Sequence, residues 1–262
     1  MLNRFKKIAV KFMLAGYLNR AYLRLQRFVD FLADYHEFRR QSRDRVDLQV
    51  AWRDRYPCLY DKTENTGFDR HYVFHTAWAA RVILKNRPLK HVDVSSSLYF
   101  CSILSASLPI EFFDYRPATL GLDNLRSERG DLLRLPFENG TIQSISCMHV
   151  VEHIGLGRYG DPLDSNGDLQ AMAELKRVLA PSGDLLFVVP VGRPRVMFNA
   201  HRIYSYEQIL HYFSDLILKE FALIPDEEAI GGLIRQANPK LVSEQTYGCG
   251  CFWFRKPASR VR

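Results

Sequence analysis

The sequence predicts an α/β protein with a doubly wound, mainly parallel sheet, preceded by a helical extension. Two observations carry this prediction. From about residue 69 onward, short apolar runs alternate with stretches of helical periodicity, whereas the first 40 residues follow helical periodicity alone. Alternating strands and helices favour a parallel sheet that is covered by helices on both faces.

The individual elements follow from periodicity and capping residues. A helix is predicted over 69–85, and Asn86-Arg87-Pro88 ends it. Ser205 and Gln208 predict a capping box for a helix that runs to Phe213. Further helices are predicted over 98–107 and 168–179. Strands are predicted over 91–95, 110–114, 142–148, 184–189, 216–223 and 249–255.

Positive charge is concentrated at the N-terminus. Residues 1–60 hold 13 Lys and Arg against 6 Asp and Glu, which accounts for the whole net charge of +7. An apolar stripe lines one face of the predicted helix, and Arg20, Arg24 and Arg27 lie off that stripe. The stripe consists of Leu14, Leu18, Tyr22, Leu25, Val29 and Leu32.

Two interpretations of this basic amphipathic helix stay open. In the first, the helix packs on the main domain or on a second subunit, and its basic face is solvated. In the second, residues 1–40 bind an anionic membrane surface or a protein partner. We expect no nucleic-acid partner, because the neutral remainder of the chain offers no basic groove. The oligomeric state does not follow from the sequence.

Composition narrows the compartment and the class of protein. With 47% hydrophobic and 25% charged residues the chain is neither disordered nor fibrous. The sequence contains no run of about 18 uncharged apolar residues, so we expect no membrane-spanning helix. The five cysteines predict free thiols in a reducing compartment, and hence a cytoplasmic protein. A peripheral position at the inner face of a membrane is the alternative location. We expect no metal, because Cys249-Gly-Cys251 lacks a second pair.

Polar residues follow several predicted strands, where a doubly wound sheet binds its ligand. Asp93 and the run Ser95-Ser96-Ser97 follow the first strand, and Asp114 ends the second. The 21-residue spacing of the two aspartates is the one at which an acidic group reaches a ribose diol. Further on lie Asp131 and Leu132, and after the strand that ends at Met148 come His149, Glu152 and His153.

The stretch from His91 to Pro190 resembles class I S-adenosylmethionine-dependent methyltransferases, through HVDVSSS, EFFDYRP, GDLLRLPFENGTIQSISCMHVVEHI and ELKRVLAPSGDLLFVVP. The pieces FDRHYVFHTAWAAR, HVDVSSS, EHIGLGRYGDPLD and FNAHRIYS resemble an uncharacterised family linked to bacterial surface-polysaccharide gene clusters. The resemblance implies a seven-stranded, Rossmann-like methyltransferase domain over residues 58–262. The basic helical extension over residues 1–57 rests on charge and periodicity alone.

The resemblance also implies S-adenosylmethionine as cofactor and a hydroxyl of a small molecule or saccharide as methyl acceptor, in surface-polysaccharide biosynthesis. It places Asp93, Ser95 and Ser97 in the loop that faces the methionine part of the cofactor. It places Asp114 on the ribose, Asp131 and Leu132 beside the adenine, and His149 near the sulfonium. His153 and His201 are the candidate bases, and Glu152 orients an imidazole.

One departure leaves an alternative open. Between Gly67 and Gly121 the chain has no glycine, although such loops are usually glycine-rich because the backbone must approach the cofactor closely. A serine at positive φ costs about 1–2 kcal/mol. Either the serine loop binds the cofactor, or the protein is a non-catalytic methyltransferase-like binding or membrane-surface assembly protein.

Two histidine pairs have competing interpretations. His149-Val-Val-Glu152-His153 matches the H-x-x-E-H motif of zinc proteases, but that motif requires a helix and His149 falls at a strand end. His71 and His75 lie four residues apart on a predicted helix. The resemblance places that helix near the cofactor loop, and a surface or core role is the other interpretation.

Overall fold

The computed structural model describes the backbone of residues 2–259 and the side chains of residues 18–259. It divides into two compact units, Met1–Gly67 and Phe68–Arg262. The predicted domain boundary at residues 57 and 58 stays a prediction. Within the described residues, no helix is both long enough and apolar enough to cross a membrane.

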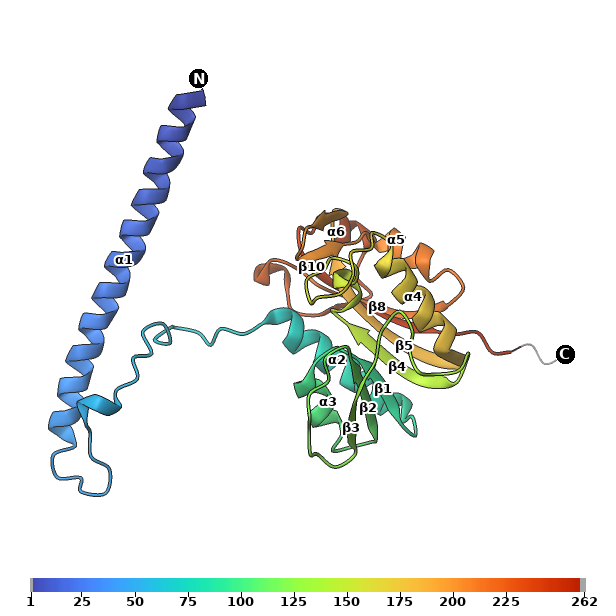
Figure 1. Ribbon diagram of the computed structural model, residues 1–262, viewed down its shortest axis with the longest axis horizontal. Coiled ribbons are helices and arrows are strands. Elements are labelled where there is room, and N and C mark those ends of the chain that lie inside the picture. The colour runs from blue at the N-terminus through green and yellow to red at the C-terminus, as the bar shows by residue number, and fades with distance from the viewer. Residues whose placement is uncertain (1, 260–262) are drawn as a thin grey trace. The chain divides into compact units, whose positions relative to one another are not determined.

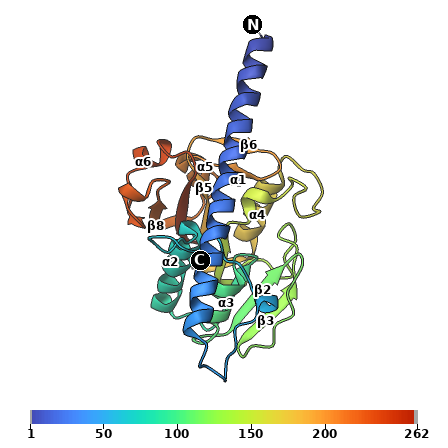
Figure 2. The ribbon, with the colours of Figure 1, turned by 90° about the vertical axis from the view of Figure 1, so that its left-hand side faces the viewer.

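The first unit is built around α1 (Leu2–Gln41), one continuous helix (Figure 2). Four residues of the predicted stripe, Leu18, Tyr22, Leu25 and Val29, are exposed. The side chain of the stripe residue Leu14 lies outside the described residues. Both interpretations of this helix therefore stay predictions.

The second unit is an α/β domain (Figure 1). Its strands are β1 (His91–Val94), β2 (Ile110–Asp114), β3 (Leu125–Arg129), β4 (Ile142–Met148), β5 (Leu179–Val191), β6 (Arg195–Met197), β7 (His201–Ile203), β8 (Ile217–Ile224), β9 (Ile234–Arg235) and β10 (Gly248–Arg255). Its α-helices are α2 (Arg70–Asn86), α3 (Leu98–Leu104), α4 (Gly167–Val178), α5 (Tyr206–Tyr212) and α6 (Pro239–Ser243).

Eight strands form the main sheet, in the order β3-β2-β1-β4-β5-β10-β8-β9. The first five are parallel, and β10 is inserted antiparallel between β5 and β8. The order 3-2-1-4-5 is that of the doubly wound nucleotide-binding fold, in which the strand order reverses beside β1 and opens a crevice at the carboxyl edge. The predicted fold class is confirmed, and the two-residue strand β9 adds an edge to the seven strands expected.

Helices cover both faces of this sheet (Figure 1). On one face, Trp78 and Ile83 of α2 and Phe100 of α3 pack against Ile110 and Val188. The other face carries α4, α5 and α6, whose buried side chains pack against alternate residues of the same strands. They include Met172, Leu175, Ile209 and Val242. Because both faces are buried, the ends of the strands are where this domain presents polar groups.

Capping residues set the helix ends that the sequence predicts. The Asp69 side chain accepts a hydrogen bond from the Tyr72 backbone at 3.1 Å and begins α2, and Arg87 ends it in the left-handed conformation. Ser205 and Gln208 form the predicted capping box of α5. Strand β3 escaped prediction, because its sequence Leu-Arg-Ser-Glu-Arg buries Leu125 alone.

Acid is expected to destabilise the domain through His91. This fully buried ring lies between the hydroxyl oxygens of Ser144 and Ser146, at 2.7 and 2.8 Å, and burial lowers its pKa to about 3. In the unfolded chain the pKa is about 6.5, so below that pH only the unfolded state binds the proton and the free energy of unfolding falls as the pH falls. The loss attributable to His91 between pH 7.5 and pH 5 is about 2 kcal/mol.

Urea unfolding at both pH values measures this loss. His91→Gln should reduce the difference between the two pH values by about 2 kcal/mol. An identical difference in the variant and the natural chain would contradict the assignment.

Candidate functional site

A cavity of about 470 Å³ opens at the carboxyl edge of the sheet. That volume lies in the range of about 300–1,000 Å³ that is typical of small-molecule sites. The loops after β1, β2, β3 and β4 all contribute to it. Among the predicted site residues, those that line it are Ser95, Asp114, Asp131, Leu132, His149 and His153.

The loop after β1 has the left-handed backbone that the absence of glycine makes costly. Ser95 has a φ of 56°, its backbone N–H donates to the Phe113 carbonyl at 2.9 Å, and its hydroxyl donates to the same oxygen at 3.1 Å. Those bonds hold the loop against β2 and hold Ser95 in a conformation that an L-residue avoids at a cost of about 1–2 kcal/mol. Ser95 therefore occupies a position that would suit glycine.

Asp93 and Ser97 support this loop and are not among the cavity-lining residues. Asp93 is fully buried; its carboxylate accepts a hydrogen bond from the Ser96 backbone at 3.0 Å and a short one from the Ser146 hydroxyl. Ser97 is the N-cap of α3 and accepts from the Phe100 backbone at 3.5 Å. Direct cofactor contact by either residue stays a prediction.

Substitution of Ser95 tests what this backbone requires. Ser95→Gly should retain ligand binding in the cavity, because glycine adopts positive φ without strain. Ser95→Val should destabilise the domain by at least about 1 kcal/mol and lower ligand affinity, since a β-branched residue resists this conformation and adds bulk to the lining. Thermal unfolding and calorimetric titration measure both effects, and equal behaviour of the two variants would contradict this role of the loop.

The acidic groups after β2 and β3 lie on the cavity wall. Asp114 is partly exposed, and one of its carboxylate oxygens accepts from the Arg116 backbone at 2.7 Å. The other oxygen has no hydrogen bond within the described residues. Asp131 similarly accepts from the Leu133 backbone at 2.9 Å, and its neighbour Leu132 is buried. Each carboxylate thus keeps an acceptor for a ligand while its turn fixes its position.

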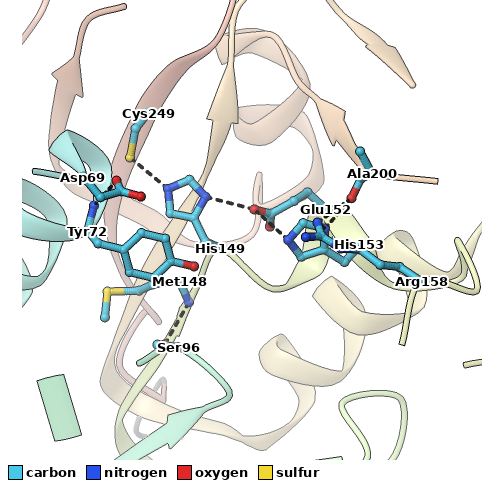
Figure 3. Close-up of polar contacts among 10 residues, drawn as sticks. All are labelled: Asp69, Tyr72, Ser96, Met148, His149, Glu152, His153, Arg158, Ala200 and Cys249. Atoms are coloured by element: carbon cyan, nitrogen blue, oxygen red, sulfur yellow. Dashed lines mark hydrogen bonds and ion pairs between the residues drawn. The ribbon is translucent and has the colours of Figure 1, made fainter. Parts of the chain in front are cut away.

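A buried carboxylate links two histidines after β4 (Figure 3). Nδ1 of His149 lies 2.9 Å from Oε1 of Glu152, and Nε2 of His153 lies 3.7 Å from the same oxygen. Nδ1 of His153 lies 2.7 Å from the Ala200 carbonyl. The Ala200 carbonyl only accepts, whereas the Arg158 guanidinium, 3.3 Å from the same nitrogen, only donates; the shorter contact with the carbonyl favours the tautomer with the proton on Nδ1 and the lone pair on Nε2. A 3-10 helix, Val151–His153, follows His149, so the α-helix that the H-x-x-E-H motif requires does not form.

His201 lies beside this group on β7. Its ring centroid is 6.4 Å from that of His153 and 4.8 Å from that of Tyr247. Burial lowers the pKa of His201, and its Nε2 has no hydrogen-bond partner among the described residues. It is not among the cavity-lining residues, and its role as a base stays a prediction.

The segment from Gly155 to Asp164 forms an ordered loop that completes the wall. The Asp161 carboxylate accepts from the backbone of Gly155 at 2.7 Å and of Tyr159 at 3.2 Å. The buried Arg202 guanidinium donates to the Ile154 carbonyl at 2.6 Å. A Cβ on Gly155 would overlap the Asp164 carbonyl, and its φ of 79° also requires glycine. The Asp161 carboxylate thus uses its hydrogen bonds to hold the backbone of its own loop.

Sequence reasoning missed several aromatic and basic lining residues. Tyr72, Tyr115, Arg116 and Tyr159 border the cavity, and the Arg116 guanidinium lies 4.9 Å from the Tyr159 ring centroid. Tyr115 and Arg116 follow Asp114 directly, so reading past the strand end would have found them. Tyr72 comes from α2, and only the tertiary fold brings it there.

Comparison with known proteins supports the fold. The structure is similar to the N-methyltransferase NodS from Bradyrhizobium japonicum, solved with S-adenosyl-L-homocysteine, at 14% identity and a TM-score of 0.51, over 84% of this chain and 98% of that one. A putative methyltransferase of Haloferax volcanii, solved with the Trm112 activator, has 19% identity and a TM-score of 0.49, over 72% of this chain and 91% of that one. The likeness to NodS shows that the chain has a class I methyltransferase-like fold.

Sequence comparison gives no activity. Residues 138–216 match the family model described as Caenorhabditis protein of unknown function, DUF268. This range runs from just before β4 through α5 and so includes Glu152, His153 and His201. No curated protein matches the chain.

Proposed function

We propose that the protein is an S-adenosylmethionine-dependent methyltransferase that acts on a hydroxyl of a small molecule or saccharide. The observation that carries the proposal is the cavity at the carboxyl edge, where the loops after four parallel strands converge. Its acidic groups, its serine loop and its volume fit an adenosyl cofactor. The fold shared with NodS supports the same class of cofactor.

In this proposal the residues of the chain bind and orient. The Asp114 carboxylate accepts hydrogen bonds from the ribose diol, and Asp131 and Leu132 flank the adenine. The loop from Ser95 to Ser97 faces the methionine part, and His149 lies at the floor of the cavity. When bound, the cofactor supplies an activated methyl group, so alignment of the acceptor provides much of the acceleration.

An oxygen acceptor also needs a base, and His153 is the best placed of the candidates. The Ala200 carbonyl holds the proton on Nδ1, so Nε2 is free to accept the proton of a hydroxyl. The Glu152 carboxylate, 3.7 Å from Nε2, stabilises the imidazolium that forms. Participation in surface-polysaccharide biosynthesis rests on the resemblance of the sequence alone.

Calorimetric titration of the full chain with S-adenosylmethionine and S-adenosylhomocysteine tests the proposal, followed by radiolabelled methyl transfer to a panel of sugar hydroxyls. We expect one equivalent of either nucleoside to bind and label to enter a hydroxyl compound. Binding without transfer to any acceptor favours the non-catalytic alternative. No heat and no thermal shift at millimolar ligand would reject the cofactor.

We further propose that residues 1–40 bind an anionic membrane surface, so that a cytoplasmic protein acts beside a membrane. The exposed side chains of Leu18, Tyr22, Leu25 and Val29 support this proposal. Leu18→Glu combined with Leu25→Glu should lower sedimentation with anionic vesicles at least about tenfold, since two apolar contacts are lost and two charges are repelled. Val46→Glu, an exposed site beyond the helix, is the control; unchanged sedimentation of the double variant would favour the packing interpretation.

A further inference from the structure

Three side chains from distant parts of the chain meet beside the cavity. They are His71 of α2, His149 after β4 and Cys249 of β10, and one potential ligand atom from each lies within 4.8 Å of the others. We propose that these three side chains bind one zinc ion. The sequence led us to expect no metal, because Cys249-Gly-Cys251 lacks a second pair. The three residues proposed here are spread over 179 residues and follow no local spacing.

The orientation of His149 is that of a metal ligand. Its Nδ1 lies 2.9 Å from Oε1 of the buried Glu152, and a carboxylate only accepts, so the proton resides on Nδ1. Its Nε2 therefore carries the lone pair, and it faces the Cys249 sulfur at 3.4 Å (Figure 3). Histidines that bind metals almost always donate their other N–H to such an outer partner.

The distances suit a tetrahedral ion. With Zn–S near 2.3 Å and Zn–N near 2.0–2.1 Å, a sulfur and a nitrogen ligand are about 3.6 Å apart. Nε2 of His149 and Sγ of Cys249, 3.4 Å apart, already have that spacing. The His71 ring now lies within 12° of parallel to the His149 ring, so it must turn to point its nitrogen at the ion. His71 is partly buried, and its ring stacks on those of His149 and Tyr247 at centroid distances of 5.3 and 5.1 Å, so this turn breaks both stacks.

A neighbouring histidine gives independent support. His75 is fully buried, its ring centroid lies 5.1 Å from that of His149, and its ring makes at most one hydrogen bond among the described residues, to the His71 backbone. Orphaned buried polar atoms are rare and call for an unseen water or ion. A water molecule on the bound zinc ion would supply a hydrogen-bond partner beside the His75 ring.

The donor set fits a metal that displaces a single proton. Zinc binds a cysteine as thiolate and a histidine as neutral imidazole, so binding at this site releases the proton of the Cys249 thiol. Imidazole and thiolate together suit zinc better than the hard cations Mg²⁺ and Ca²⁺.

The site adjoins the cavity through His149, which lines it. Three protein ligands leave a fourth position for water or a hydroxyl, as in catalytic zinc sites. The inference stands apart from the proposed methyl transfer, because zinc affinity is measured without any cofactor. Calorimetry with S-adenosylmethionine on the metal-free chain shows separately whether the cofactor proposal fails.

The test is zinc titration of the chelator-stripped full chain against a chromophoric chelator, with Co²⁺ as a spectroscopic substitute. We expect one equivalent of tightly bound zinc and a sulfur-to-cobalt charge-transfer band. His71→Asn and Cys249→Ser should each lower zinc affinity by at least about 100-fold, and Glu152→Gln by about 10–100-fold. The matched controls are His211→Asn and Cys58→Ser, both exposed sites, which should leave zinc affinity unchanged.

Cys249 is buried in the core. If its variant does not fold, the cobalt spectrum of the natural chain and the zinc affinity of His71→Asn decide. A zinc-free natural chain after incubation with zinc, absence of the charge-transfer band, or His71→Asn with unchanged affinity would each overturn the proposal. Loss of zinc in Cys58→Ser would assign the metal to the surface thiol instead.

Discussion

Asp114→Ala is expected to weaken the binding of S-adenosylmethionine about 100-fold. The Asp114 carboxylate lies on the cavity wall, and its turn to Arg116 uses only one of its two oxygens. Each hydrogen bond to a charged group contributes about 1.5–3 kcal/mol. Loss of the two bonds to a ribose diol, partly replaced by water, costs about 3 kcal/mol, which corresponds to about 100-fold in the dissociation constant.

The matched control is Glu111→Ala, which removes the same charge from the same strand. Glu111 pairs with Lys90 at 2.9 Å, away from the cavity lining. Calorimetric titration with S-adenosylmethionine compares the dissociation constants of both variants with that of the natural chain. If Asp114→Ala bound the cofactor with unchanged affinity, the ribose assignment would be wrong.

Arg202→Ala is expected to lower the free energy of unfolding by about 3–5 kcal/mol, the cost of breaking a buried ion pair. Nε of Arg202 lies 3.6 Å from Oδ2 of Asp168, and both side chains are buried. Its guanidinium also donates to the Ile154 carbonyl at 2.6 Å, at the start of the loop that walls the cavity. Within the described part of the chain, the variant leaves the buried Asp168 carboxylate with the Tyr204 hydroxyl, 2.9 Å away, as its one remaining side-chain partner.

The same substitution should lower cofactor affinity, since Ile154, Gly155 and Asp164 line the cavity. Urea unfolding measures the stability, and Arg193→Ala, at an exposed arginine nearby, provides the control. A loss for Arg202→Ala no greater than for Arg193→Ala would mean that Arg202 does not anchor the loop.

The fold was largely predictable, because it depends on local patterns. Strands β2 and β4 have the predicted bounds, and the predicted capping box of Ser205 and Gln208 is present. The parts of the fold that the sequence did not predict have no apolar pattern typical of a strand. Strand β3 is mostly polar, and β5 begins at Leu179, five residues before the predicted start, because it continues through Pro181-Ser182-Gly183.

The candidate site was predictable where it follows strand ends. Six predicted residues line one cavity, because parallel strands bring their carboxyl ends together. Asp93 and Ser97 also follow β1, but their side chains bond to the loop and to the α3 N-terminus. Sequence order gives the position of a residue along the chain and not the direction of its side chain. The meeting of His71 with Cys249 depends on tertiary packing alone, which no local pattern encodes.

The central claim is that the carboxyl edge of the sheet binds one adenosyl group. A crystal structure of the full chain with S-adenosylhomocysteine tests it most directly. We predict that the ribose contacts the Asp114 carboxylate, that the adenine lies beside Asp131 and Leu132, and that the sulfur lies toward His149. Full-occupancy ligand density at another surface, or a serine loop that fills the cavity at saturating ligand, would contradict the account.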